Sequence, residues 1–154
     1  MPRILLDTNL MLLLAVGLTS RSYVSRHRRL QAYTLEDFDH IVSLIGGASG
    51  VATCPNVWSE TSNLVRYASA PLSEQIAATL RLLIERWDET YIESTAAAAR
   101  AEHTRLGVTD AVLLVMAQSG SVLLTDDLPI YLAATRAGYA AINFNHLREA
   151  RYGR

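Results

Sequence analysis

The chain has 154 residues, of which 50% are hydrophobic, and its formal net charge is −1. This length and composition suit one domain with a sizeable core. The small net charge argues against binding nucleic acid through bulk electrostatics, but it does not exclude a local basic patch. All 14 basic residues are Arg, which excludes P-loop enzymes and Schiff-base lysine enzymes. Cys54 is the single Cys, which excludes an internal disulfide and a Cys-rich zinc site.

The first element in chain order is a short apolar run, residues 4–6, that ends in Asp7-Thr8-Asn9. A continuous apolar run suits a strand buried on both faces of a parallel sheet, and polar residues after it then lie where open α/β sheets bind ligands. Asp7 is therefore either the N-cap of the next helix or a carboxylate in a crevice. That helix, residues 10–18, should end near Gly17. It is too short to span a bilayer, so we expect a cytoplasmic protein without membrane contact.

Residues 19–33 are polar and basic. A solvated surface segment is the usual interpretation of such a charge run, and contact with phosphate groups is the alternative. The arginines of this segment are Arg21, Arg26, Arg28 and Arg29. A capping-box pattern from Thr34 to Asp37 then predicts a helix, and residues 51–53 read as a second strand.

Pro55 suits the first turn of a helix that carries Glu60. Glu60 shares a helical face with apolar neighbours, and a buried acid seldom lacks a partner, which hints at function. Beyond this helix, the pattern predicts a helix capped by Ser73, a third strand at residues 90–92 and one Ala-rich helix over residues 94–106.

The next two segments carry the remaining acids. Thr109 is a candidate N-cap for a helix that is apolar nearly all round and therefore buried, with Asp110 in its first turn. Residues 121–125 read as a fourth buried strand that ends in Asp126-Asp127, which repeats the arrangement at Asp7. A helix opened by Pro129, a fifth strand at residues 139–142 and a basic helix over residues 145–154 complete the chain.

This alternation of strands and helices predicts a parallel sheet covered on both faces, with the acids meeting at one edge. Several carboxylates a few ångström apart repel one another, and a hard divalent cation relieves that repulsion. Mg²⁺ or Mn²⁺ suits an all-oxygen site, where it can activate water for displacement at phosphorus. A phospho-accepting receiver domain also clusters acids, but the lysine that it needs is missing.

Four motifs of this chain, in their order and spacing, resemble the PIN-domain ribonucleases, and the resemblance covers Ile4 to about Phe144. The motifs are Leu6-Asp7-Thr8-Asn9, Pro55 to Glu60, Gly107 to Asp110 with its Ala-rich helix, and Leu124-Thr125-Asp126-Asp127. The resemblance implies a three-layer α/β/α sandwich with a parallel sheet of four to five strands in the order 3-2-1-4-5. We expect a single domain over residues 1–154, with an arginine-rich insertion around residues 18–47.

The resemblance also implies the roles of individual residues. The acidic quartet falls on Asp7, Glu60, Asp110 and Asp127; the family spacing selects Asp127 over Asp126, which stays a further candidate ligand. The residues implied to hold metal are Asp7, Asp110, Asp127 and Asp126. Those implied to orient the acids or a water are Thr8, Asn9 and Thr125.

Two functions from different classes follow. The first is an Mg²⁺- or Mn²⁺-dependent endoribonuclease that cleaves single-stranded or loop RNA, the toxin of a type II toxin–antitoxin pair, with the arginine segment gripping phosphate. The second is a non-catalytic RNA- or protein-binding module. Retention of all four acids favours the first. An RNA substrate and a cognate antitoxin are the expected partners, and a homodimer stays open.

Overall fold

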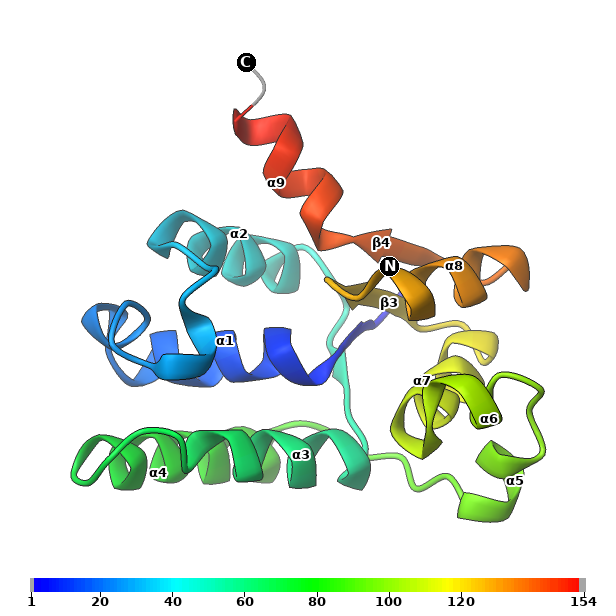
Figure 1. Cartoon of the computed structure of the whole chain (residues 1–154), viewed down its shortest axis with the longest axis horizontal. Coiled ribbons are helices and arrows are strands. Elements are labelled where there is room, and N and C mark those ends of the chain that lie inside the picture. Colours follow the sequence, from blue (N-terminus) through cyan, green and yellow to red (C-terminus); the bar gives the residue numbers. More distant parts are fainter. Residues whose placement is uncertain (1, 153–154) are drawn as a thin grey trace.

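The computed structural model describes residues 2–152 and contains a four-stranded, fully parallel sheet (Figure 1). Its order is β2-β1-β3-β4, so the first strand of the chain lies inside the sheet. In register, Leu5 stands between Ala52 and Leu123. The strands are β1 (Ile4–Leu6), β2 (Val51–Ala52), β3 (Val122–Thr125) and β4 (Ala141–Asn143).

Helices connect these strands and form two groups (Figure 1). In the view of Figure 1, α1 to α4 gather on the left and α5 to α8 on the right, while α9 projects upward. The first group and its short 3₁₀ turns are α1 (Thr8–Thr19), η1 (Arg21–Tyr23), η2 (Arg28–Leu30), α2 (Leu35–Gly46), α3 (Pro55–Val65) and α4 (Leu72–Arg86). The rest are α5 (Ser94–Ala98), α6 (His103–Leu106), α7 (Val108–Gln118), α8 (Leu128–Arg136) and α9 (Phe144–Tyr152). The predicted α/β class with a parallel sheet is confirmed.

The helix α1 is the centre of the first group. Its residues Leu10 to Gly17 are all buried, and it packs against α2, α3 and α4. We expected this helix to end near Gly17, but it continues to Thr19. Gly17 serves a different purpose, because a Cβ there would meet the Phe38 ring of α2 at 2.2 Å. The glycine therefore permits a close approach of two helices.

The predicted third strand at residues 90–92 is wrong. The chain makes one parallel bridge there, between Thr53 and Glu89, together with a hydrogen bond of 2.8 Å from the Thr90 backbone N–H to the Thr53 carbonyl. Tyr91 is 73% exposed, so the segment lacks the burial that would hold a longer strand against the sheet. Within residues 2–152 the sheet has four strands, so the predicted five-stranded order 3-2-1-4-5 is not observed there.

The predicted Ala-rich helix is also wrong, because residues 94–106 form two short helices, α5 and α6. Arg100 fixes the turn between them. Its guanidinium donates to Glu102 at 2.9 Å and to the Tyr139 hydroxyl at 3.1 Å. The contact with Tyr139 is tertiary, and tertiary contacts routinely override helix propensity such as that of the alanines here. Over residues 2–152, no helix combines the length and apolar character needed to cross a bilayer.

Candidate active site

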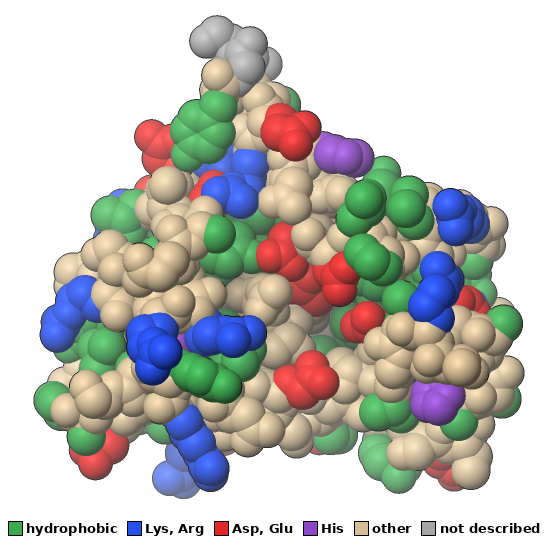
Figure 2. Space-filling view, in the orientation of Figure 1, with side chains coloured by type: hydrophobic (Ala, Val, Ile, Leu, Met, Phe, Trp, Pro, Cys, Tyr) green, Lys and Arg blue, Asp and Glu red, His purple; other side chains and the backbone are tan. Residues whose placement is uncertain are grey.

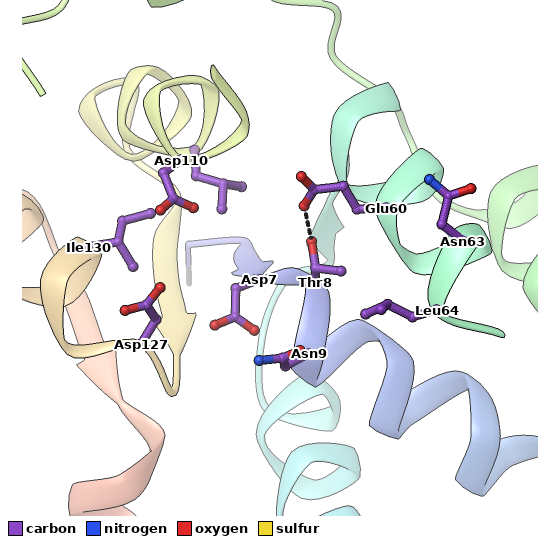
Figure 3. Close-up of a pocket in the computed structure, with 10 residues that line it drawn as sticks. Asp7, Thr8, Asn9, Glu60, Asn63, Leu64, Asp110, Asp127 and Ile130 are labelled. Atoms are coloured by element: carbon purple, nitrogen blue, oxygen red, sulfur yellow. Dashed lines mark hydrogen bonds between the residues drawn. The ribbon is translucent and has the colours of Figure 1, made fainter. Parts of the chain in front are cut away.

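A cavity of about 350 Å³ opens at the carboxyl ends of β1 and β3 (Figure 3). Acidic side chains from β1–α1, α3, α7 and β3–α8 face the same space in Figure 3. Figure 2 shows acidic groups along a hollow near the middle of this face. The lining residues are Asp7, Thr8, Asn9, Glu60, Asn63, Leu64, Asp110, Leu113, Asp127 and Ile130. The sequence-predicted acids Asp7, Glu60, Asp110 and Asp127 are thus brought together.

Asp7 is both the helix cap and a wall of the cavity. Its Oδ1 accepts from the Leu10 backbone N–H at 3.0 Å, and its Oδ2 accepts from the Thr125 hydroxyl and from the Asp126 N–H at 3.1 Å. The side chain is 7% exposed. Both sequence interpretations of Asp7 therefore describe the same residue, whose carboxylate is fixed by neutral donors alone.

Glu60 links two helix starts across the cavity. Its Oε2 accepts from the Thr8 hydroxyl at 2.9 Å (dashed in Figure 3), and its Oε1 accepts from the Thr109 hydroxyl at 3.0 Å. Glu60 is exposed, whereas Val57 and Thr61 on α3 are buried, so the inward orientation predicted for Glu60 is wrong. It lines the cavity rather than the core.

Thr109 has a function that the sequence interpretation missed. We expected it to cap the helix that carries Asp110, but α7 begins at Val108 and its N-cap is Gly107, whose φ is +90°. The Thr109 hydroxyl is then free to orient Glu60. Its position directly before Asp110 was the available sequence signal.

The adjacent acids Asp126 and Asp127 face different surroundings. Asp127 lines the acidic cavity, whereas the Asp126 carboxylate accepts from the Tyr33 hydroxyl and lines a neighbouring pocket. The Thr125 hydroxyl connects Asp7 with Asp127, since it donates to the Asp7 carboxylate and accepts from the Asp127 N–H at 3.0 Å. Tyr33, a second residue that the sequence interpretation missed, ties the arginine-rich insertion to this motif.

Burial and repulsion from neighbouring acids disfavour the charged forms of Asp7, Asp110 and Asp127. Burial, followed by the charge of Asp126, raises the pKa of Asp7 well above its ordinary value, although the hydrogen bonds from Thr125, Leu10 and Asp126 oppose this rise. Burial, then the charges of Asp127 and Glu60, raises the pKa of Asp110 to about 6. Burial and the charge of Asp126 also raise the pKa of Asp127. Such an accumulation of raised carboxyl pKa values is typical of functional sites.

The donor set fits a hydrated hard cation better than a closed metal cage. The acidic side chains of the cavity offer oxygen ligands, which suit Mg²⁺ or Mn²⁺. Among the His, Cys, Asp and Glu residues of 2–152, however, no three lie in an arrangement that could hold one ion. Mg²⁺ usually keeps several waters and binds through one or two carboxylates, so an arrangement of separated acids is compatible with it.

The four arginines predicted to bind RNA lie in different environments. Arg21 donates to both oxygens of Asp39 on α2, and Arg26 lies 5.4 Å from the centroid of the Tyr23 ring. Arg28 and Arg29, in contrast, line the pocket that Asp126 shares. The segment therefore does not act as one uniform basic patch.

Comparisons with known proteins add no identification. No protein-family model, no curated protein and no solved structure matches the chain.

Proposed function

We propose that this protein is an Mg²⁺- or Mn²⁺-dependent endoribonuclease that cleaves single-stranded or loop RNA in the cytoplasm. One observation carries the proposal: four carboxylates from separate chain segments line one cavity at the carboxyl edge of a parallel sheet. None of the described residues that line this cavity is basic. A fold that keeps unneutralised acids together tolerates their repulsion, which favours a role in binding a cation.

The proposal includes a PIN-like, three-layer α/β/α fold. Support comes from the strand order β2-β1-β3-β4, which matches the corresponding part of the order 3-2-1-4-5. The positions of Asp7 after β1, Glu60 on α3, Asp110 on α7 and Asp127 after β3 give further support, because they follow the order of the family motifs.

Within this proposal, one or two of the carboxylates of Asp7, Asp110 and Asp127 contact the cation directly and the others act through its water ligands, with Asp126 as a further candidate ligand. When bound, the divalent ion supplies Lewis-acid stabilisation of a phosphodiester and lowers the pKa of a bound water. Glu60, held between the hydroxyls of Thr8 and Thr109, is placed to orient a water or accept its proton. Thr125 fixes Asp7, and Asn9 lies on the cavity wall.

The decisive experiment measures cleavage of an RNA with single-stranded loops in the presence of Mn²⁺. We expect Asp110→Asn to reduce the rate by about 100-fold or more, since loss of metal activation costs several kcal/mol of barrier. Asp88→Asn is the matched control, because Asp88 is exposed and pairs with Arg3 away from the cavity. Cleavage by Asp110→Asn at the wild-type rate, with unchanged melting, contradicts the nuclease proposal.

We further propose that the nuclease is the toxin of a type II toxin–antitoxin pair, blocked by a cognate antitoxin. An Arg or Lys of that partner would meet the acidic cavity and replace the cation electrostatically. Growth of cells that express the chain alone tests this role, with Asp7→Asn as the inactive comparison. Equal growth of the two cultures removes the support for toxin activity.

A second candidate function is a non-catalytic RNA- or protein-binding module. The observation that favours it is the separation of the acids, which leaves no three together around one ion among the described residues. This function predicts RNA binding without cleavage in Mg²⁺ and in Mn²⁺, and it predicts equal binding by wild type and Asp110→Asn. The cleavage experiment therefore distinguishes the two functions.

A further inference from the structure

A second pocket, of about 400 Å³, lies beside the acidic cavity. Asn9 lines both, so the two form neighbouring parts of one surface. Figure 2 shows basic groups to the left of the acidic hollow, over the connection between α1 and α2. The lining residues are Asn9, Arg28, Arg29, Gln31, Ala32, Tyr33 and Asp126. We call it the arginine pocket.

The two arginines of this pocket are available for a ligand. Arg28 and Arg29 are exposed, and neither forms an ion pair with a carboxylate of residues 2–152. Arg29 lies 5.2 Å from the centroid of the Tyr67 ring, which is itself 47% exposed. The one acid of the pocket, Asp126, accepts from the Tyr33 hydroxyl. With two guanidinium groups and one carboxylate, the pocket carries a net positive charge.

The backbone beneath these arginines is anchored in the core. His27 is fully buried, and its Nδ1 accepts from the Arg29 N–H at 3.1 Å. Leu30, at the other end of η2, is 1% exposed and belongs to the hydrophobic core. The two side chains thus extend from a fixed turn, so binding a ligand costs little further backbone entropy.

We propose that the arginine pocket binds the phosphates of single-stranded RNA whose neighbouring phosphodiester lies in the acidic cavity. In this path the strand passes over Asn9, while Arg28 and Arg29 contact its phosphates. The part of the Tyr67 ring that Arg29 leaves exposed receives a base. Guanidinium groups bind phosphate bidentately, and aromatic faces beside cations are typical of single-strand sites. This inference rests on the proposed function and assigns the path of its substrate.

The position of the acids favours a single strand over a duplex. They line a cavity between α3, α7 and α8, with Asp7 only 7% exposed at its wall. A flexible strand can place a phosphodiester inside such a cavity, while the bases of a paired duplex are not free to stack on Tyr67.

The test measures the binding of a fluorescent single-stranded RNA of about ten nucleotides in chelator, where cleavage is absent. We expect Arg28→Gln/Arg29→Gln to weaken binding about tenfold at low salt and to reduce the log–log salt slope by about 1.4, since each lost contact removes about 0.7. The matched control, Arg86→Gln/Arg136→Gln, removes the same charge from the ends of α4 and α8 and should leave the slope unchanged. Thermal melts verify that each variant folds.

Further variants and a duplex RNA, measured in the same way, test whether binding depends on the arginine pocket itself. Tyr67→Ala should weaken single-strand binding without altering the salt slope, and Arg21→Gln/Arg26→Gln should change the slope less than the pocket variant does. Equal effects of all double variants overturn the pocket, because they indicate long-range charge alone. Equal wild-type affinity for a duplex of the same length overturns the single-strand path.

The proposed function can fail separately. If Asp110→Asn cleaves RNA like wild type while Arg28→Gln/Arg29→Gln loses binding, the nuclease assignment fails and the pocket stands. If cleavage is lost in Asp110→Asn and the pocket variant binds like wild type, the nuclease stands and this inference is overturned.

Discussion

The buried acids Asp37 and Asp7 show two ways of keeping a carboxylate inside the protein. Asp37 on α2 is 0% exposed, and both of its carboxylate oxygens contact arginines of α9. Arg148 Nε lies 3.2 Å from Oδ2, and Arg151 Nη2 donates to Oδ1. It also accepts from the Thr34 backbone N–H at 2.8 Å. Asp7, at 7% exposure, has neutral donors alone.

The difference separates an acid that joins two elements from an acid that, under the proposed function, binds a cation. Two cations offset the desolvation of Asp37, so its charge attaches α9 to α2. No cation stands among the described residues that line the cavity of Asp7, and burial raises the pKa values of Asp7, Asp110 and Asp127. The ion-paired acid and the acids of the cavity thus have opposite electrostatic surroundings in one small domain.

The largest expected difference between the Asp37 ion pairs and the acidic cavity is in the free energy of unfolding. We expect Asp37→Asn to lower the free energy of unfolding by about 3 kcal/mol, because it leaves two arginines without their carboxylate. Asp110→Asn, which removes a repelled charge, should leave the metal-free protein unchanged or slightly more stable. Urea denaturation in chelator measures both. If Asp110→Asn lost as much stability as Asp37→Asn, Asp110 would be a structural acid like Asp37.

Stabilisation by a divalent cation should depend on the acids of the cavity and not on the ion pairs of Asp37. At a Mn²⁺ concentration 100 times its dissociation constant, binding to the folded state alone adds about 2.7 kcal/mol. We expect this gain in wild type and in Arg151→Gln, and a smaller gain in Asp127→Asn. Thermal melts over a Mn²⁺ titration measure it. A wild-type melting temperature that ignores Mn²⁺ contradicts the assigned cation site.

The raised pKa values predict how metal-free stability depends on pH. Asp110, with a pKa of about 6, holds its proton to higher pH in the folded state than in the unfolded state, where the pKa is about 3.9. Stability therefore falls as pH rises from about 4 to about 6, and the raised pKa of Asp7 prolongs the fall.

Comparison with a variant isolates the contribution of Asp110. Between about pH 4 and pH 6, wild type should lose about 1 kcal/mol more stability than Asp110→Asn, a figure reduced for solvent screening of a partly exposed group. Urea titrations in chelator at several pH values measure the difference. Parallel pH profiles of the two proteins would show that Asp110 titrates normally.

The smallest effect concerns the bridge made by Glu60. Thr109→Val removes one hydrogen bond to Glu60 and keeps the shape of the side chain, so we expect a loss of about 0.5 kcal/mol in stability. A larger, several-fold decrease in cleavage should accompany it if Glu60 needs both hydroxyls for its orientation. Thr95→Val, at the start of α5 and away from the cavity, is the control. Equal cleavage by both variants means that Thr8 alone orients Glu60.

Local patterns predicted much of the fold and of the cavity. The apolar runs before Asp7 and Asp126 predicted β1 and β3, because continuous hydrophobicity with polar ends is a local property of buried parallel strands. The sheet then places the ends of both strands at one edge, which brings Asp7 and Asp127 to one cavity. Acids that follow strands are therefore a usable signal.

Contacts between distant segments could not be predicted from the chain alone. The Asp37–Arg151 pair joins residues 114 apart in sequence, and the Tyr33–Asp126 hydrogen bond joins residues 93 apart. The break between α5 and α6 likewise depends on Arg100 reaching Tyr139. Helix propensity and hydrophobic period carry no information about such partners.

The short edges of the sheet have a consequence for self-association. β2 has two residues and β4 has three, and α9 begins directly after β4. Beyond β2, the Thr53 hydroxyl donates to the Asp88 carbonyl at 2.7 Å and the Thr53 carbonyl accepts from Thr90. Few backbone groups are therefore left to recruit a strand from another molecule, and the protein should resist edge-to-edge aggregation in concentrated solution.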